Sequence, residues 1–183
     1  MRKYIRIVGG QYRRTPISVP DTPGLRPTPD RVRETLFNWL NHLWQGEFAG
    51  KQVLDLFAGS GALGFEAASR GVAHVQMVEA DPKAVAALRS LRDKLKSHAV
   101  RIHAGDAKQA LSRLENARFD LICLDPPFGA GWFPALLTEI YSLLNTGGLV
   151  YAESEQTLTA PEGYIALRQG RAGAVHYQLF QRN

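Results

Sequence analysis

Cysteine is almost absent from the sequence, since Cys123 is the only one in 183 residues. This excludes an internal disulfide and fits a reducing compartment such as the cytosol. Because Cys123 lies within an apolar run, we interpret it as a packed core thiol rather than a nucleophile. Long apolar runs are also missing, and none approaches the roughly 18 residues of a membrane span. The start, Met-Arg-Lys-Tyr-Ile-Arg, has no long apolar stretch behind it. We therefore expect a cytoplasmic protein without membrane contact or secretory leader.

Acidic residues are scarce near the amino terminus. Residues 1–33 contain eight Lys or Arg and only two Asp, a net charge of +6, whereas the whole chain carries +5. A concentrated basic face is typical of proteins with a polyphosphate partner, so we expect nucleic acid to bind there. A merely solvated basic surface is the alternative. The five histidines show no ligand spacing, and we expect no metal site. They are His42, His74, His98, His103 and His176.

The amino-terminal segment reads as a basic hairpin followed by a proline-rich loop. Residues 5–8 and 17–19 are short β-rich runs with glycines and polar residues between them. Four prolines within residues 20–29 exclude regular structure there. We expect Thr28 to cap the helix that follows, with Pro29 at its first position.

From residue 52 onward, strand and helix patterns alternate. The expected strands cover residues 53–57, 74–79, 100–104, 119–124 and 149–153. The expected helices cover residues 63–70, 82–95, 107–114 and 134–144, the last one ended by Gly147-Gly148. Residues 164–169 and 175–181 read as a closing hairpin. Alternation of this kind predicts an α/β fold with a doubly wound parallel sheet, whose last strand the hairpin makes antiparallel. We expect an extension over residues 1–29 and a main domain over residues 30–183.

Residues 121–128, Leu-Ile-Cys-Leu-Asp-Pro-Pro-Phe, end a buried strand with a candidate catalytic group. Pro126 and Pro127 have no N–H to donate, so the strand must stop at Asp125. In an open α/β sheet, ligands bind outside the carboxyl ends of the strands. There the Asp125 carboxylate and the Pro126 carbonyl can accept hydrogen bonds from a planar amine, and Phe128 offers a stacking face. A strand followed by a simple turn is the alternative.

A glycine motif lies between the first buried strand and its helix. Gly59, Gly61 and Gly64 form G-x-G-x-x-G, which allows a ligand to approach the backbone closely. The motif alone fits dinucleotides as well. Asp55, however, adds negative charge where a pyrophosphate would lie, and it suits a cationic ligand such as an amino group.

Two further acidic residues end strands. Glu79 is placed to bind both hydroxyls of a ribose, whereas Asp81 is expected to cap the next helix. Asp106 can accept from an adenine amino group, with the Ala107 N–H near a ring nitrogen, although a helix cap is an equal alternative. Three acidic strand ends beside one glycine loop favour an adenosine-like ligand with a positive end.

Together these motifs resemble class I methyltransferases that use S-adenosylmethionine. The matching stretches, in family order, are Asp-Leu-Phe-Ala-Gly-Ser-Gly at 55–61, Val-Glu-Ala-Asp at 78–81, Gly-Asp-Ala at 105–107 and Leu-Asp-Pro-Pro-Phe at 124–128. The Asp-Pro-Pro-Phe element resembles that of enzymes acting on planar nitrogens. At the front, residues 6–11 (Arg-Ile-Val-Gly-Gly-Gln) and 25–37 (Leu-Arg-Pro-Thr-Pro-Asp-Arg-Val-Arg-Glu-Thr-Leu-Phe) resemble the RsmD family of small-subunit ribosomal RNA guanine-N2 methyltransferases.

The resemblance implies a Rossmann-like class I methyltransferase fold with a mostly parallel seven-stranded sheet, its last strand antiparallel, and an N-terminal hairpin that binds RNA. It implies S-adenosylmethionine as cofactor, S-adenosylhomocysteine as product and no metal. The implied cofactor contacts are Arg26, Thr28, Asp55, Phe57, Gly59, Ser60, Gly61, Glu79, Ala80, Asp106 and Ala107. The implied reaction is methylation of one guanine N2 in 16S rRNA, of the type that acts on guanine 966. The substrate would be the small subunit or its assembly intermediate, and the enzyme a monomer.

The resemblance also sorts the remaining residues into RNA and target contacts. The RNA contacts that we expect are Arg6, Gln11, Arg13, Arg14 and Arg31. The target base must leave its stack to reach Asp125, Pro126, Pro127 and Phe128, and Phe128 would then stack on it. Two rivals remain open: a methyltransferase of another planar amine (DNA adenine N6 or protein glutamine N5), and a nucleic-acid-binding module without activity. A NAD-dependent oxidoreductase is disfavoured, because Asp55 is unfavourable and no hydride-transfer acid pair is present.

Overall fold

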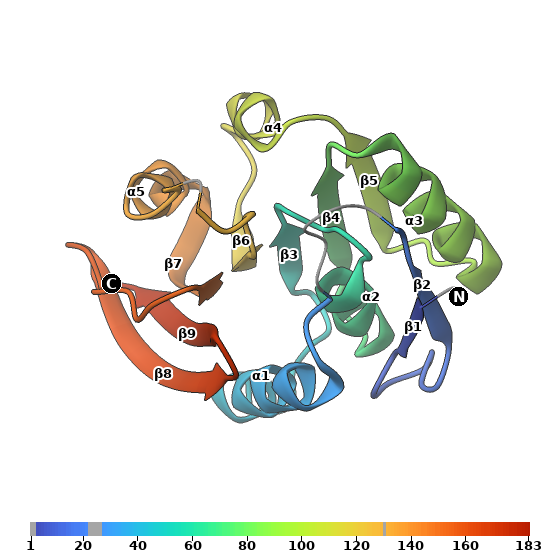
Figure 1. Cartoon of the computed structure of the whole chain (residues 1–183). Coiled ribbons are helices and arrows are strands. Elements are labelled where there is room, and N and C mark those ends of the chain that lie inside the picture. Colours follow the sequence, from blue (N-terminus) through green and yellow to red (C-terminus); the bar gives the residue numbers. More distant parts are fainter. Residues whose placement is uncertain (1–2, 22–26, 130) are drawn as a thin grey trace.

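A seven-stranded sheet forms the centre of the molecule (Figure 1). The structure, a computed structural model, describes residues 3–21, 27–129 and 131–183, so the predicted cofactor contact Arg26 lies outside the described residues. The strands, in sheet order, are β5 (Val100–Ala104), β4 (His74–Glu79), β3 (Gln52–Asp55), β6 (Phe119–Leu124), β7 (Leu144–Ser154), β9 (Val175–Arg182) and β8 (Tyr164–Ala172). Pairs from β5 to β7 are parallel, whereas β9 is antiparallel to both β7 and β8. The predicted parallel sheet with an antiparallel last strand is confirmed.

Helices cover both faces of this sheet (Figure 1). They are α1 (Asp30–Leu43), α2 (Ala62–Ser69), α3 (Pro82–Leu95), α4 (Ala107–Arg113), α5 (Ala135–Glu139) and the 3₁₀ turn η1 (Tyr141–Leu143). Strand side chains alternate between faces, so β6 contributes Leu121 and Cys123 to the core under α1, α2 and α3. Its alternate residues Ile122 and Leu124 belong to the core under α4 and α5. Within the described ranges no helix is both long and apolar enough to cross a membrane.

The order of the strands reverses between β3 and β6. The chain proceeds outward from β3 to β4 and β5, and then returns to place β6 on the other side of β3. At such a switch point the connections leave in opposite directions, and a crevice opens beyond the carboxyl ends of the two strands. The fold therefore places the residues that follow β3 and β6 where ligands bind in open α/β sheets.

The amino-terminal hairpin forms a separate antiparallel sheet of β1 (Lys3–Arg6) and β2 (Pro16–Val19), as predicted. It packs against the helix layer, because Ile7 and Ile17 are buried in the same core as α1 and α2. The turn of the hairpin also contacts the end of α2: the Tyr12 N–H donates to Ser69 Oγ at 2.9 Å. The hairpin is thus fixed to the main sheet through α2, and the division of the chain at residue 29 stays a prediction.

The predicted cap of α1 is wrong. Pro29 occupies the N-cap position, and no side-chain cap bond is made there. The Thr28 hydroxyl donates instead to Glu153 Oε1 at 2.7 Å, because the segment before α1 lies against the end of β7. The Thr28 hydroxyl is therefore bonded to a residue distant in the chain, Glu153, and not to the first turn of α1.

The predicted end of the last helix at Gly147-Gly148 is also wrong. Helix α5 ends earlier, at Glu139, and β7 already begins at Leu144. The pairing of β6 with β7 is irregular at its start. A Cβ at Gly148 would lie only 2.8 Å from the Asn145 carbonyl oxygen, so the glycine permits a close backbone approach within an irregular strand.

Candidate active site

Carboxylates from neighbouring strands gather at the carboxyl edge of the sheet. They are Asp55 at the end of β3, Glu79 at the end of β4, Asp125 after β6 and Glu153 in β7. Asp55 pairs with Cys123, which pairs with Tyr151, so these three side chains share one face of the sheet. Asp125 and Glu153 each lie two residues further along the same strands. The edge therefore brings together Asp55, Glu79 and Asp125, which were predicted site residues, with Glu153, which was not. All four lie on the face of the sheet that α1 and α2 cover.

The glycine loop is bonded to two of these carboxylates. The Gly59 N–H donates to Glu79 Oε2 at 2.7 Å, and the Gly64 N–H donates to Asp55 Oδ2 at 3.0 Å. Gly61 adopts φ +81°, and a Cβ there would lie 2.5 Å from the Leu88 side chain. The loop therefore requires glycine for its turn, and it fixes the direction of both carboxylates.

Burial changes the acid–base properties of this group. Asp55 is 2% exposed, and burial raises its pKa to about 7, with further repulsion from Glu79 and Glu153. The pKa values of Asp125 and Glu153 are also raised, in both cases mainly by burial. In the part of the chain that the structure describes, no ion pair joins Asp55, Asp125 or Glu153 to a cation. The edge therefore favours a bound cation or proton.

Glu153 is a candidate functional residue that sequence reasoning missed. It is 4% exposed and accepts hydrogen bonds from the Thr28 hydroxyl at 2.7 Å and the Tyr151 hydroxyl at 2.9 Å. The sequence could have indicated Glu153, because it is an acidic residue near the end of a predicted parallel strand, as Glu79 is. Thr28, predicted as a cofactor contact, lies at this carboxylate cluster.

The Asp-Pro-Pro-Phe element begins where β6 ends, as predicted, since the strand stops at Leu124. Asp125 is half-buried and Pro126 is buried, whereas Pro127 is exposed and Phe128 has 42% of its surface exposed. The arrangement thus combines a sheltered carboxylate with an accessible aromatic ring. Such a pair can accept hydrogen bonds from a planar group and stack on it, and the catalytic roles of the four residues stay predictions.

An aromatic pair that was not predicted lies near the expected adenine side. Phe57, a predicted cofactor contact, meets Trp132 edge to face with ring centroids 5.1 Å apart. Lys108, in the first turn of α4, lies 5.7 Å from the centroid of the Trp132 ring. Trp132 therefore lies between the residue after β3 and the start of α4, and no motif in the sequence marks it.

The expected adenosine contacts already make hydrogen bonds within the chain. Glu79 accepts from the N–H groups of Gly59 and Asp81, at 2.7 and 2.8 Å. Asp106 accepts from the Lys108 N–H at 2.9 Å and caps α4, so its alternative interpretation as a helix cap is confirmed. Ser60 and Ala107 are buried and Ala80 is exposed. Their contacts with a cofactor stay predictions.

The predicted RNA contacts occupy different environments. Gln11, Arg13, Arg14 and Arg31 are exposed. Arg6 is also exposed, but its Nε pairs with Asp30 Oδ2 at 3.0 Å. Arg33, one of the cations of the basic segment, has no exposed surface at all. The basic surface is therefore carried by the hairpin turn and the start of α1, and not by every basic residue in the segment.

Comparison with known proteins gives consistent matches over nearly the whole chain. Residues 5–181 match a family described as conserved hypothetical protein 95. The ribosomal RNA small subunit methyltransferase D of Escherichia coli (strain K12) is 41% identical over 97% of this chain and 90% of its own length. The protein of the same name from Haemophilus influenzae is 38% identical over 97% of this chain and 93% of its own length. A solved structure described as putative methyltransferase yhhF from Escherichia coli has a TM-score of 0.84 at 38% identity and covers 98% of both chains.

Proposed function

The chain belongs to the RsmD family of ribosomal RNA small subunit methyltransferases, and from this premise we propose that it methylates the exocyclic N2 of one guanine in 16S rRNA. The methyl donor would be S-adenosylmethionine and the product S-adenosylhomocysteine. One observation carries the proposal: the Asp-Pro-Pro-Phe element lies beside the buried carboxylates Asp55 and Glu153 at one edge of the sheet. A planar amine and a cationic cofactor would meet there.

The residues at this edge fit S-adenosylmethionine. Carboxylates that no described cation pairs with, and whose pKa values burial raises, favour the positive ammonium and sulfonium of this cofactor. Asp55 and residues 59–61 would bind the methionine end, Glu79 the ribose, and Asp106 with Ala107 the adenine. A carboxylate offers about four acceptor sites, so Glu79 and Asp106 retain capacity beyond their backbone donors. When bound, the sulfonium supplies an activated methyl group.

Asp125 and Pro126 would position the acceptor amine. The guanine N2 lone pair is delocalised into the ring, so the amine is a poor nucleophile. Hydrogen bonds from its two protons to the Asp125 carboxylate and the Pro126 carbonyl would direct the lone pair toward the methyl group. Orientation of this kind can contribute several kcal/mol, up to about 7–11 kcal/mol in well-oriented cases. The raised pKa of Asp125, caused first by burial, suits it to receive the N2 proton.

The exposed groups around this site would bind the RNA. Phe128 would stack on the flipped base, since its ring is exposed beside Asp125. Arg13 and Arg14 in the hairpin turn, with Arg31 on α1, would bind phosphates. Phosphate contacts carry little sequence information, so we propose that the substrate is RNA already folded within the small subunit or its assembly intermediate. The enzyme would act as a monomer in the cytoplasm.

The test is methyl transfer from labelled S-adenosylmethionine to naked small-subunit RNA, assembled small subunits and duplex DNA, all from cells that lack the enzyme. The product is digested to nucleosides. We expect label in N2-methylguanosine from subunits or RNA. Label in N6-methyladenine of DNA, or in protein glutamine, would show that the acceptor is one of these amines and not guanine N2. Cofactor binding without any transfer would favour a binding module without activity.

A further inference from the structure

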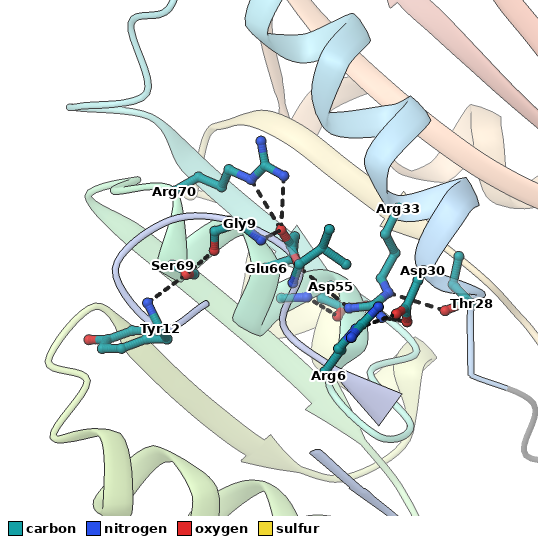
Figure 2. Close-up of polar contacts among 12 residues, drawn as sticks. Arg6, Gly9, Tyr12, Thr28, Asp30, Arg33, Asp55, Glu66, Ser69 and Arg70 are labelled. Atoms are coloured by element: carbon teal, nitrogen blue, oxygen red, sulfur yellow. Dashed lines mark hydrogen bonds and ion pairs between the residues drawn. The ribbon is translucent and has the colours of Figure 1, made fainter. Parts of the chain in front are cut away.

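Glu66 is a buried carboxylate that the proposed reaction does not use. It lies on α2 with no exposed surface, and its two oxygens accept hydrogen bonds from different elements (Figure 2). From the hairpin, the N–H groups of Val8 and Gly9 donate at 2.7 and 2.8 Å. From the end of α2, Arg70 donates through Nε and Nη2 at 3.1 and 3.0 Å. Glu66 therefore attaches the hairpin backbone to the helix layer.

Arg33 completes this group from α1 and is itself fully buried. Its Nη1 lies 3.4 Å from Glu66 Oε2, and its Nη2 donates to Asp30 Oδ1 at 2.6 Å. Its Nε donates to the Thr28 carbonyl oxygen at 3.2 Å (Figure 2). Burying a charge is costly unless the charge is paired and hydrogen-bonded, and these three contacts meet that condition. Because a guanidinium presents its donors in a rigid fork, they also fix Thr28 relative to α1 and α2.

Thr28 continues the connection from Arg33 into the active site. The residue is 3% exposed; its carbonyl accepts from Arg33, and its hydroxyl donates to Glu153. Glu153 follows Ala152, which is paired with Leu124, so it lies beside Asp125 across the β6–β7 pair. One residue, Thr28, therefore connects the buried guanidinium of Arg33 to the carboxylate next to the proposed catalytic one.

A firmly held Glu153 leaves Asp125 available for the substrate. Neighbouring buried carboxylates tend to share a proton, because both cannot easily be charged at once. A proton shared with Glu153 would occupy an Asp125 oxygen that the amine needs. The hydroxyls of Thr28 and Tyr151 satisfy Glu153 instead.

We propose that Arg33 is a positioning residue for methyl transfer, acting through Thr28 on Glu153. The proposal rests on the function proposed above, because it assigns Asp125 the acceptor role. It assigns Arg33 no contact with RNA or cofactor. Its effect is to hold the Thr28 hydroxyl on Glu153, so its loss should appear in the rate of transfer rather than in binding.

Four single variants separate this role from a purely structural one. Arg33→Lys keeps the charge but loses the fork, so it cannot reach Asp30, Glu66 and the Thr28 carbonyl together. Arg70→Lys is the matched control, because it makes the same change in the other arginine bonded to Glu66, at a site with no bond to Thr28. Thr28→Val removes the hydroxyl at similar volume, and Thr28→Ser keeps it.

The measurements are kcat and KM for RNA methylation, the Kd for S-adenosylmethionine, and the thermal midpoint of each variant. We expect Arg33→Lys and Thr28→Val to lower kcat by roughly tenfold to a hundredfold, as small misplacements do. In Arg33→Lys, which changes no proposed contact with RNA or cofactor, the KM for RNA and the Kd for the cofactor should change little. Thr28→Ser should recover most of the rate. Arg70→Lys should lower the midpoint, because it also weakens contacts with Glu66, and it should leave kcat unchanged.

The double variant Arg33→Lys with Thr28→Val tests the order of action. If Arg33 acts through Thr28, the double variant should lose no more kcat than Thr28→Val alone, because effects along one path are not additive. Additive losses, an unchanged kcat in Arg33→Lys, or an equal loss in Arg70→Lys would overturn the proposal. If the wild-type protein methylates another acceptor, the proposed function fails and the same comparison is made on that acceptor. A wild-type protein inactive on every acceptor overturns both proposals.

Discussion

Among the described residues, the carboxylate of Glu66 and the carboxylates at the edge of the sheet are sheltered from solvent, and their charges are balanced in opposite ways. Glu66 is surrounded by the guanidinium groups of Arg33 and Arg70 and by two hairpin N–H groups. Asp55 and Glu153 are held by neutral donors, and no cation among the described residues pairs with either of them or with Asp125. The described residues neutralise the charge of Glu66 and provide no cation for Asp55, Asp125 and Glu153. Both groups contain fully buried carboxylates, so the lack of a cationic partner among the described residues is what distinguishes the proposed active site.

Removing one member of the group without cations should have the largest effect on activity. Asp125→Ala should lower methyl transfer by roughly a hundredfold to ten-thousandfold, the range for a lost acid–base group. The fold should be nearly normal, because the substitution removes a repulsive charge and no cation among the described residues loses its partner. The cofactor affinity should also be nearly normal, because Asp55, residues 59–61, Glu79 and Asp106 are the proposed cofactor contacts and remain in place. Steady-state transfer and calorimetric titration with S-adenosylmethionine measure the two quantities. A large loss of cofactor affinity would show that Asp125 was assigned to the wrong ligand.

Removing Glu66 should have its main effect on stability. Glu66→Ala leaves the buried Arg33 with Asp30 as its remaining carboxylate partner, and it removes the acceptor of the Val8 and Gly9 N–H groups. Breaking a buried ion pair costs about 3–5 kcal/mol. Denaturant unfolding measures the loss, and Glu66→Gln, which keeps the acceptor oxygen and the shape, should lose less. Asp125→Ala is the control for the removal of a carboxylate as such. An unfolding free energy unchanged in Glu66→Ala would remove the contrast between the two groups.

The pH dependence of stability should sharpen the same contrast. Burial raises the pKa of Asp55 from 3.8 to about 7, so the folded protein holds this proton more tightly than the unfolded chain does. The free energy of unfolding of the unliganded protein should therefore fall as pH rises from about 4 to about 7, by at most about 1.4 kcal/mol per pH unit for one group. Asp55→Asn should flatten this fall, as measured by denaturant unfolding over a pH series. If the free energy of unfolding of Asp55→Asn falls with pH as steeply as that of the wild type, other groups cause the pH dependence.

The smallest effect is expected on the outer surface, where charges are solvated. Replacing Arg13 and Arg14 by Ala should weaken RNA binding and reduce the slope of log affinity against log salt by about 1 for each lost phosphate contact. Filter binding over a salt series measures this slope. The same double change at the exposed Arg113 and Arg118 is the control and should leave it unaltered. If replacing Arg13 and Arg14 leaves the slope of log affinity against log salt unchanged, the hairpin turn is not part of the RNA interface.

The elements that the sequence predicted well are those determined by local pattern. β4, β5, β6 and α3 occupy the predicted ranges, because buried apolar runs and a cap residue define them from within. Asp81 caps α3 as predicted, accepting from the Ala84 N–H at 2.8 Å. The gathering of Asp55, Glu79 and Asp125 could also be predicted, since parallel strands end at one edge and each acid ends a strand.

Two of the predictions that failed involve partners far apart in the chain. Thr28 has the chemistry of a cap residue, yet its partner Glu153 lies 125 residues away. Arg33 counted toward a basic surface, yet it is buried against Glu66, 33 residues further along. A polar position on a helix has the same local pattern whether it faces water or a buried acid. Such pairs depend on how helices and strands pack against one another, and this packing cannot be predicted from the local spacing of residues.

The attachment of the hairpin to Glu66 also sets an order of events during synthesis. A chain leaves the ribosome amino terminus first, at about 5–20 residues per second. Val8 and Gly9 are made 58 and 57 residues before their acceptor, so their N–H groups remain hydrated, for times on the order of seconds, until α2 emerges. The hydrogen bond of the Thr28 hydroxyl forms later still, because its acceptor Glu153 is made 125 residues after Thr28. A nascent chain can therefore dock its hairpin early, whereas the contact between Thr28 and Glu153 at the proposed active site forms only when β7 has been made.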